Sequence, residues 1–229
     1  MSNDPNTMLR GVPFLSSVDE ATLTRLAQHL RRRTFRRNEV IFHRGDPAGA
    51  LHIIRSGRVK VTLPSEEGEE TVLALFRSGD VFGDMGALDG GPRSATITAV
   101  EPTETLVLLR EDLLSCARDF PDLALALLET VIARLRRTDG LLEDAYFLDL
   151  DTRLARRLIE LSETHGRAVP DGIEVDFPLT QSDIAGMLGV TRVSINRQLA
   201  VYQDAGLVRL NRGSFTLLRP DVLRRRAGW

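Results

Sequence analysis

The hydrophobic pattern of this 229-residue chain changes its period near Pro121, and that change limits the possible folds more than any other feature. Before it, short apolar runs alternate with glycine-containing turns. After it, apolar residues recur three and four positions apart. The first pattern is typical of an antiparallel sheet and the second of a helix. The chain is therefore expected to be of the α+β class, with a group of strands followed by a long helix.

Six short apolar runs predict strands, at residues 40–42, 51–54, 59–63, 71–76, 95–100 and 105–109. They follow one another at roughly ten-residue spacing with glycine turns between them, which indicates an antiparallel barrel or roll. A helix over residues 20–30 is predicted to precede them, and the arginines at 31–33 and 36–37 to form a solvated edge. Cys116 is expected to be a small buried residue on a helix.

The region after Pro121 carries a narrow apolar stripe with a 3-4 repeat, typical of a coiled-coil seam over about three heptads. Its positions are Leu125, Leu128, Ile132, Leu135, Asp139, Leu142 and Tyr146. A helix packed on its own roll is the alternative, but so regular a stripe favours a second helix. A second copy of the chain would supply one, so we predict a homodimer through a helix over residues 119–147.

Composition excludes several classes of protein. A single cysteine cannot build an internal disulfide, a four-cysteine zinc site or an iron–sulfur cluster, and we predict no metal. No apolar run approaches the roughly 18 residues of a membrane span, and the N-terminus lacks the pattern of a secretory signal, so the cytoplasm is the expected compartment. No nucleophile-elbow, zinc-protease or phosphate-loop motif occurs, so we predict that the chain is not an enzyme.

The segment 179–199 has the pattern of a helix-turn-helix. Thr180 is placed to cap a first helix, Gly189 to end it, and Thr191 to begin a second. A helix from residue 152, a strand near 173–177, these two helices and a ribbon at 206–218 give the element order of a winged helix-turn-helix. Residues 151–229 carry 12 basic against 9 acidic residues, whereas residues 1–150 carry 18 against 23.

The second of these helices is predicted to read the major groove of double-stranded DNA. An ordinary helical hairpin would not explain two outward arginines followed by a ribbon. Arginine can contact phosphate or form forked bonds to guanine, and the ribbon arginines are placed for backbone contacts. The predicted DNA-binding residues are Thr191, Arg192, Val193, Ser194, Asn196, Arg197, Arg209 and Arg212. The arginines at 224–226 are predicted to be a frayed, solvated end.

Residues 82–96 combine a glycine turn, a one-turn helix and an Arg93-Ser94 pair before a strand. Backbone amides at a helix start together with a buried arginine make an anion site, and the apolar wall of a roll can hold a ring. The alternative is a structural turn in which Arg93 pairs with Asp84.

With these motifs, the chain resembles the cyclic-AMP receptor protein/FNR superfamily of bacterial transcription regulators, from about Val12 to Leu223. The resemblance implies an N-terminal antiparallel β-roll of the cyclic-nucleotide-binding type at 12–118, a long dimerisation helix at 119–147 and a C-terminal winged helix-turn-helix at 148–223. It implies a hinge near 147–149. It also implies cyclic AMP as effector, a palindromic DNA operator and RNA polymerase as a partner.

The residues that match this family are Gly83, Arg93, Ser94 and Thr138, which the resemblance implies for ligand binding. Asp84 replaces the family's ribose-binding Glu, and Asp139 replaces a Ser contributed across the dimer. Cyclic AMP is favoured, but the departures leave another small ligand, or activity without one, as alternatives. A nucleotide-binding regulatory subunit of an enzyme is disfavoured, because such chains lack a recognition helix. In that helix Val193 stands where the family has Glu.

Overall fold

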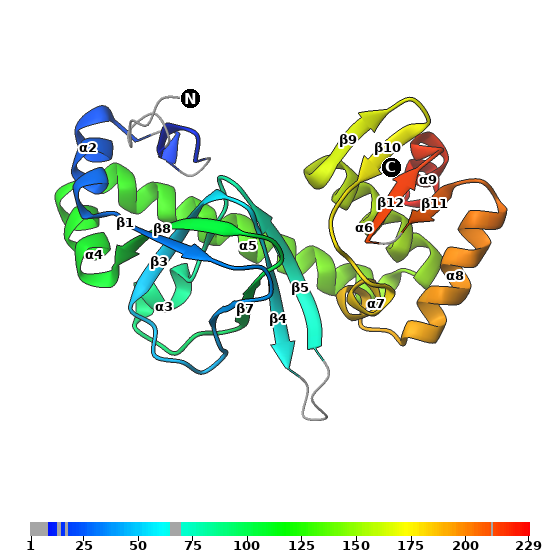
Figure 1. The fold of residues 1–229 in the computed structure, drawn as a ribbon, viewed down its shortest axis with the longest axis horizontal. Helices are drawn as coiled ribbons and strands as arrows, with labels where there is room; N and C mark the ends of the chain where they lie inside the picture. Colours follow the sequence, from blue (N-terminus) through cyan, green and yellow to red (C-terminus); the bar gives the residue numbers. More distant parts are fainter. Residues whose placement is uncertain (1–8, 13–14, 17, 65–69, 212) are drawn as a thin grey trace. The chain divides into compact units, whose positions relative to one another are not determined.

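The computed structural model describes residues 9–12, 15–16, 18–64, 70–211 and 213–229. The chain forms two compact units, one from residues up to 136 without 70–72, the other from residues 70–72 and 137–229. The first is a β-roll with helices and the second a winged helix-turn-helix (Figure 1). The predicted α+β class, with a roll, a long helix and a C-terminal helix-turn-helix, is confirmed.

Two four-stranded sheets form the roll, and every described pairing in them is antiparallel. One has the order β1-β8-β3-β6, with bounds Arg31–Phe35, Thr103–Leu109, Ala50–Ser56 and Val81–Phe82. The other has the order β2-β7-β4-β5, with bounds Val40–Phe42, Thr96–Ala99, Arg58–Pro64 and Glu70–Arg77. All six predicted strands are therefore present.

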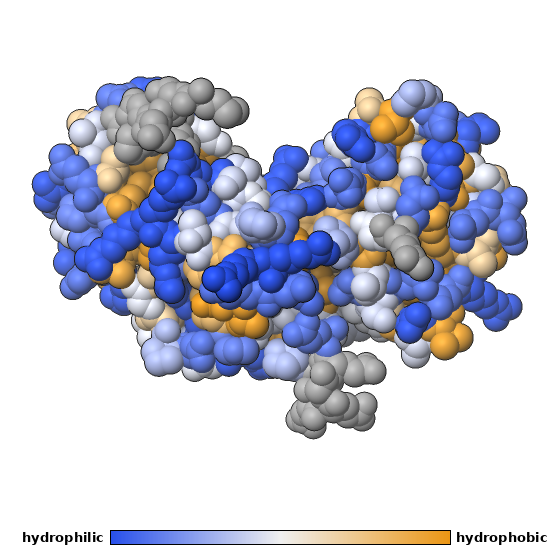
Figure 2. All heavy atoms as spheres, in the orientation of Figure 1, coloured by the Kyte–Doolittle hydropathy of each residue, from blue (hydrophilic) through white to orange (hydrophobic). Residues whose placement is uncertain are grey.

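Strands β1 and β6 were not predicted. β1 pairs with β8 along its whole length, and Phe35 is its one buried residue. The arginines at 31–33 are exposed, which confirms the solvated edge, although the backbone beneath them is a strand. In the face drawn in Figure 2, hydrophilic side chains cover much of the surface over this strand.

Two apolar clusters hold the roll together. The interior cluster consists of Ile54, Val59, Val61, Phe82, Ala95 and Ile97. The larger cluster packs helices α2 (Glu20–His29), α4 (Arg110–Asp119) and the start of α5 (Pro121–Phe147) against strands β3 and β8. Cys116 lies in α4 and is 2% exposed, so the prediction of a buried helical cysteine is confirmed.

Helix α5 presents two different apolar faces. At its start Leu123, Ala126 and Leu127 are buried against the roll. The predicted seam stays exposed in the single chain, from 41% at Ile132 to 81% at Tyr146. The alternative of a helix packed on its own roll therefore holds for the first turns of α5, whereas the stripe is left uncovered in the single chain.

In the second unit, the helices that follow α5 pack around one sheet. The helices are α6 (Leu150–His165), α7 (Gln181–Leu188), α8 (Arg192–Asp204) and α9 (Pro220–Arg226). The sheet has the order β11-β12-β10-β9, with bounds Val208–Asn211, Ser214–Leu217, Gly172–Val175 and Gly166–Val169. The strand predicted near residue 173 is β10, and it pairs with β9, which was not predicted.

The C-terminal arginines are exposed, as predicted, but they do not form a frayed end, and that part of the prediction was wrong. They lie in α9, whose Leu223 is fully buried and which packs on α6. Arg224 pairs with Glu163 at 2.8 Å, and Arg226 pairs with Asp151 at 3.1 Å. The packed structure thus continues beyond residue 223, the end expected from the sequence.

Candidate functional site

The turn before β7 is shaped around the side chain of Arg93. Gly83 precedes the short helix α3 (Asp84–Asp89) in the left-handed conformation, with φ of 76°. A Cβ at this position would collide with the guanidinium of Arg93. Glycine is needed here both for the backbone angle and for the space.

Arg93 is 7% exposed and only partly satisfied. Its Nη1 donates to the Gly83 carbonyl at 3.0 Å, and its guanidinium lies 4.0 Å from the centroid of the Phe42 ring. Its Nε is buried without a hydrogen-bond partner among the described residues. Burial lowers the pKa of Arg93, and the carboxylates of Asp46 and Asp84 oppose that shift. A buried cation with a free donor suits an anion.

Asp84 is 3% exposed, and it pairs with a residue that the sequence did not indicate. Its Oδ1 accepts from Arg134 Nη1 on α5 at 2.8 Å, whereas its Oδ2 is buried and unpaired within the described structure. The alternative of a closed Arg93–Asp84 turn is therefore not what forms. Arg134 lies 50 positions from Asp84 in the chain, so no local pattern links the two residues. The one feature of the sequence that could have indicated Arg134 is its position one helical turn before Thr138.

The other predicted ligand residues lie differently. Ser94 is exposed, with its Oγ 3.6 Å from the Met85 sulfur. Thr138 and Asp139 are exposed on α5. The structure thus gathers Gly83, Asp84 and Arg93 into one cradle, leaves Ser94 exposed, and leaves the two helix residues accessible in the single chain.

Aromatic side chains form the wall behind Arg93. His52 is 4% exposed, stacks on Phe82 with ring centroids 4.8 Å apart, and lies 6.0 Å from Phe42. Its Nδ1 is 3.2 Å from the hydroxyl of Thr105. Burial, aided by the positive charge of Arg93, lowers the pKa of His52 from 6.5 to about 3. The wall therefore stays uncharged at neutral pH.

This shift predicts a pH-dependent stability. The unfolded chain takes up a proton at His52 near pH 6.5, but the folded chain does not until about pH 3. Between these two pH values the unfolded state binds more protons, so the free energy of unfolding decreases as the pH is lowered, by about 1.4 kcal/mol per pH unit. The advantage of wild type over His52→Gln in urea unfolding should shrink by that slope below pH 6.5. His43→Gln, at an exposed histidine, is the control. A difference that does not change with pH would contradict the shift.

The helix-turn-helix is built by local capping. Thr180 and Asp183 form a reciprocal capping box at the start of α7, and Gly189 ends it in the left-handed conformation with φ of 62°. Thr191 then caps α8 by accepting from the Ser194 backbone amide at 3.2 Å. Ile195 and Leu199 are buried. These caps fix where α8 begins, and therefore which of its residues face outward.

The predicted DNA-binding residues are not all equally presented. Arg192 and Arg197 are exposed, and Val193 is 77% exposed. Asn196 differs from the prediction of an outward side chain, because its Oδ1 is buried without a described partner.

On the ribbon, Arg209 is half-exposed and pairs with Asp171 at 3.1 Å. Arg212 lies outside the described residues. Of the predicted DNA-binding residues within α8, the exposed ones are therefore Arg192, Val193 and Arg197.

Other site types find no support in the part of the chain that the structure describes. There, no group of three or more His, Cys, Asp or Glu side chains is arranged to hold a metal ion. No helix among the described residues has both the length and the apolar character to cross a membrane.

A roll with a buried anion cradle, joined to a winged helix-turn-helix, defines a transcription regulator with a ligand-binding domain. Family comparison agrees, because the cyclic nucleotide-binding domain matches residues 32–120 and the Crp-like helix-turn-helix domain matches residues 152–226. The chain belongs to the cyclic-AMP receptor protein/FNR superfamily, and it is a DNA-binding transcription regulator of that family with a cyclic-nucleotide-binding domain.

Individual relatives cover nearly the whole chain. The CRP-like cAMP-activated global transcriptional regulator of Mycobacterium tuberculosis is 31% identical over 93% of this chain and 96% of its own length. The cyclic AMP receptor protein of Thermus thermophilus is 32% identical over 94% and 96%. The solved structure of the c-di-GMP-responsive regulator CLP of Xanthomonas campestris superposes with a TM-score of 0.75 at 26% identity, covering 87% of this chain and 99% of that one. These relatives are transcription regulators and not enzymes.

Proposed function

We propose that the chain is a homodimeric transcription regulator of the cytoplasm whose binding to a palindromic operator is controlled by cyclic AMP, with RNA polymerase as its protein partner. One observation carries the effector part of the proposal. In the cradle, Arg93 keeps a buried donor and Asp84 a buried acceptor, neither with a partner among the described residues. A ligand that carries both an anion and a hydroxyl satisfies the two together.

Each cradle residue is proposed to bind the part of the ligand that its charge suits. Arg93 neutralises the cyclic phosphate, because a guanidinium donates through several N–H groups and stays charged at neutral pH. The free Oδ2 of Asp84 accepts from a ribose hydroxyl, while Arg134 holds Oδ1. Ser94 adds a hydroxyl donor to the phosphate, and the exposed Thr138 and Asp139 contact the base. The two curated relatives named above, described as cAMP-activated and as a cyclic AMP receptor, support this ligand.

Two departures support an alternative ligand. Asp84 is one methylene shorter than the family's Glu, and Asp139 places a carboxylate where the family has a hydroxyl. The structural relative from Xanthomonas campestris responds to c-di-GMP, and other relatives at 31% identity are global nitrogen regulators. The second candidate is therefore the same regulator with another small ligand.

Calorimetric titration of the purified protein separates these candidates. We expect cyclic AMP to bind, cyclic GMP to bind more weakly, and operator affinity to rise when cyclic AMP is present. Binding of c-di-GMP instead would favour the second candidate. Tight operator binding that no nucleotide changes would contradict control by a ligand.

The domain organisation belongs to the same proposal. Residues 12–118 form the ligand-binding domain, residues 119–147 the dimerisation helix, and residues from 148 the DNA-binding domain. The ends of α5 at Phe147 and of α4 at Asp119 support these boundaries. The match of the Crp-like domain through residue 226 supports including α9 in the DNA-binding domain.

Sequence readout at Val193 gives a prediction about the operator. Arg192 and Arg197 keep the guanine contacts that the family resemblance implies, but a valine cannot accept a bond from a cytosine amino group. It can pack only against an apolar edge such as the thymine methyl. We expect the base pair facing Val193 to be relaxed or shifted toward A·T, with discrimination reduced by about 1–3 kcal/mol. Selection from randomised palindromic half-sites measures this directly.

The variant Val193→Glu should restore a preference for C·G at that base pair. Val201→Glu is the matched control, because it adds the same charge to an exposed valine further along α8. Both variants should weaken overall DNA affinity through charge repulsion, but only the first should change base preference. Full C·G stringency in the wild type would mean that Val193 does not face a base.

A further inference from the structure

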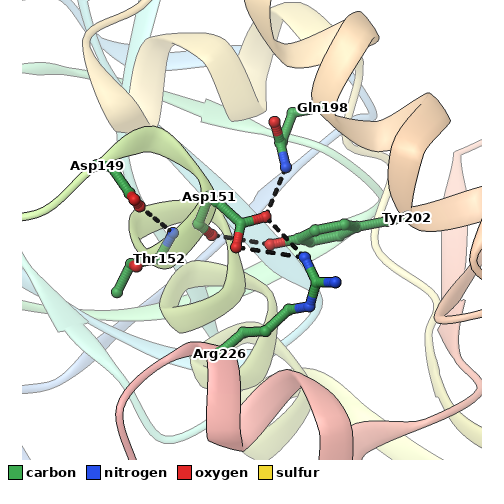
Figure 3. Close-up of polar contacts among 6 residues, drawn as sticks. All are labelled: Asp149, Asp151, Thr152, Gln198, Tyr202 and Arg226. Atoms are coloured by element: carbon green, nitrogen blue, oxygen red, sulfur yellow. Dashed lines mark hydrogen bonds and ion pairs between the residues drawn. The ribbon is translucent and has the colours of Figure 1, made fainter.

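Asp151, in the first turn of α6, is the centre of a polar network in the second unit that none of the functions above uses (Figure 3). Its Oδ1 accepts from Gln198 Nε2 of α8 at 2.6 Å and from Arg226 Nη1 of α9 at 3.1 Å. Its backbone carbonyl accepts from the Tyr202 hydroxyl at 2.8 Å. One residue therefore holds two helices at once.

The contact to α8 is made by a pair of residues one helical turn apart. Gln198 and Tyr202 are at positions i and i+4, so they lie on the same face of the helix. Two bonds along one face hold a helix against both rotation about its axis and sliding along it. Arg197, next in sequence to Gln198, is exposed. The grip on Asp151 thus sets the angle at which the exposed residues of α8 point.

Tyr202 is suited to this role because it is fully buried and stays protonated. Burial, with the Asp151 carboxylate close by, raises the pKa of its hydroxyl, which keeps the proton that it donates. The guanidinium of Arg226 lies 5.5 Å from the centroid of its ring. Arg226 therefore contacts both Asp151 and the helix that Asp151 holds.

A second link joins α6 to the end of α5, across the two residues 148–149 that lie between these helices. Arg156 of α6 donates through Nη1 to Asp144 of α5 at 2.6 Å and through Nε to the Ala227 carbonyl at 2.8 Å. Asp149 caps α6 by accepting from the Thr152 amide at 2.8 Å. Arg156 therefore connects the end of α5 with the end of α9.

We propose that Asp151 and Arg226 are positioning residues for the recognition helix α8, so that base discrimination depends on the C-terminal helix α9. This inference rests on the proposed function as a sequence-specific DNA binder. Neither residue needs to touch DNA. When the network is intact, α8 has a single orientation. Without Arg226, the Asp151 carboxylate that accepts from Gln198 loses its charge partner and the Tyr202 ring loses a contact, so α8 is held less firmly and its exposed residues meet the bases less accurately.

Two variants that each remove one positive charge from α9 test the proposal. Arg226→Gln breaks the contact to Asp151, whereas Arg225→Gln is the matched control, because Arg225 pairs only weakly with Asp221 at 3.4 Å in an exposed position. Each full-length variant is titrated, at several salt concentrations, with the operator obtained by selection and with a random duplex of equal length. The ratio of the two affinities is the specificity ratio.

We expect both variants to lose the same small amount of affinity for random DNA, since each loses one charge. Arg226→Gln should in addition lower the specificity ratio at least tenfold, whereas Arg225→Gln should keep it within twofold of wild type. Arg226→Lys, which can still pair with Asp151, should recover most of the ratio. Equal ratios in Arg226→Gln and Arg225→Gln would overturn the inference.

Tyr202→Phe keeps the test valid should Arg226→Gln unfold, because it removes only the hydroxyl that reaches Asp151. We expect Tyr202→Phe to keep a melting temperature near that of wild type and nevertheless to lower the specificity ratio. An unchanged ratio would count against the proposal. A wild type that does not discriminate operator from random DNA with any effector would overturn the proposed function itself. By contrast, a wild type that discriminates operator from random DNA, together with variants that have equal specificity ratios, would overturn only the inference about Asp151 and Arg226.

Discussion

Arg93→Leu is expected to abolish the response of DNA binding to the effector. The cyclic phosphate loses its buried charge partner, and leaving a buried charge unpaired costs about 2–5 kcal/mol, or roughly thirtyfold to several thousandfold in affinity. Among the described residues Arg93 has no direct ion pair whose loss would disturb the roll, and its contacts there are to the Gly83 carbonyl and the Phe42 ring. Calorimetry with cyclic AMP, paired with operator titration, measures both consequences.

The matched control is Arg77→Leu, which makes the same substitution at an exposed arginine of the same roll. It should bind cyclic AMP as wild type does. Arg93→Lys keeps the charge but loses the planar fork, so its affinity should lie between wild type and Arg93→Leu. If Arg93→Leu folds and binds the nucleotide with unchanged affinity, the cradle is not the effector site.

The roll was predictable because its information is local. Each apolar run with its glycine turn predicts a strand without reference to distant residues, and all six predicted strands form. β1 was missed because three successive arginines hide the alternation that marks a strand. It becomes a strand through its pairing with β8, which lies some 70 positions away in the chain, and no local pattern reports such a contact.

The cradle was predictable only in part, for a similar reason. Gly83 and Arg93 are close in sequence, and their types alone indicate an anion site. The partner of Asp84 is instead Arg134, on a helix whose packing against the roll brings it near. Tertiary packing decides which of several arginines approaches a given carboxylate.

The C-terminal arginines also show that contacts between residues distant in the chain cannot be predicted from a local pattern. A run of like charges is typical of a solvated segment, and the side chains of Arg224 and Arg225 are indeed about half-exposed or more. Arg226 is distinguished by partners far away in the chain, the Asp151 carboxylate 75 positions earlier and the ring of Tyr202. Capping, in contrast, was readable at Thr180, Gly189 and Thr191, because a cap depends on residues within four positions.

Placing a charge in the seam of α5 is expected to convert a dimer to monomers. Leu128 and Leu135 are 54% and 59% exposed in the single chain, at seam positions on the face that is open to a partner. Burying a leucine contributes about 1.5–3 kcal/mol, and a two-fold interface loses it twice, so either Leu128→Asp or Leu135→Asp should weaken the dimer by about 3–6 kcal/mol. Sedimentation equilibrium across the micromolar range measures this loss.

Loss of the dimer should also abolish specific operator binding. A two-fold protein reads two half-sites about one helical turn apart, and a monomer holds only one of them. Ala133→Asp is the control, because it adds the same charge to an exposed position of α5 outside the seam and should leave assembly intact.

Asp139 is the one seam position that already carries a charge, and a two-fold axis brings its copies toward each other. Asp139→Ser should therefore strengthen the ligand-free dimer, in the direction opposite to the leucine variants. A wild type that sediments as a monomer throughout the micromolar range would refute the pairing of these helices.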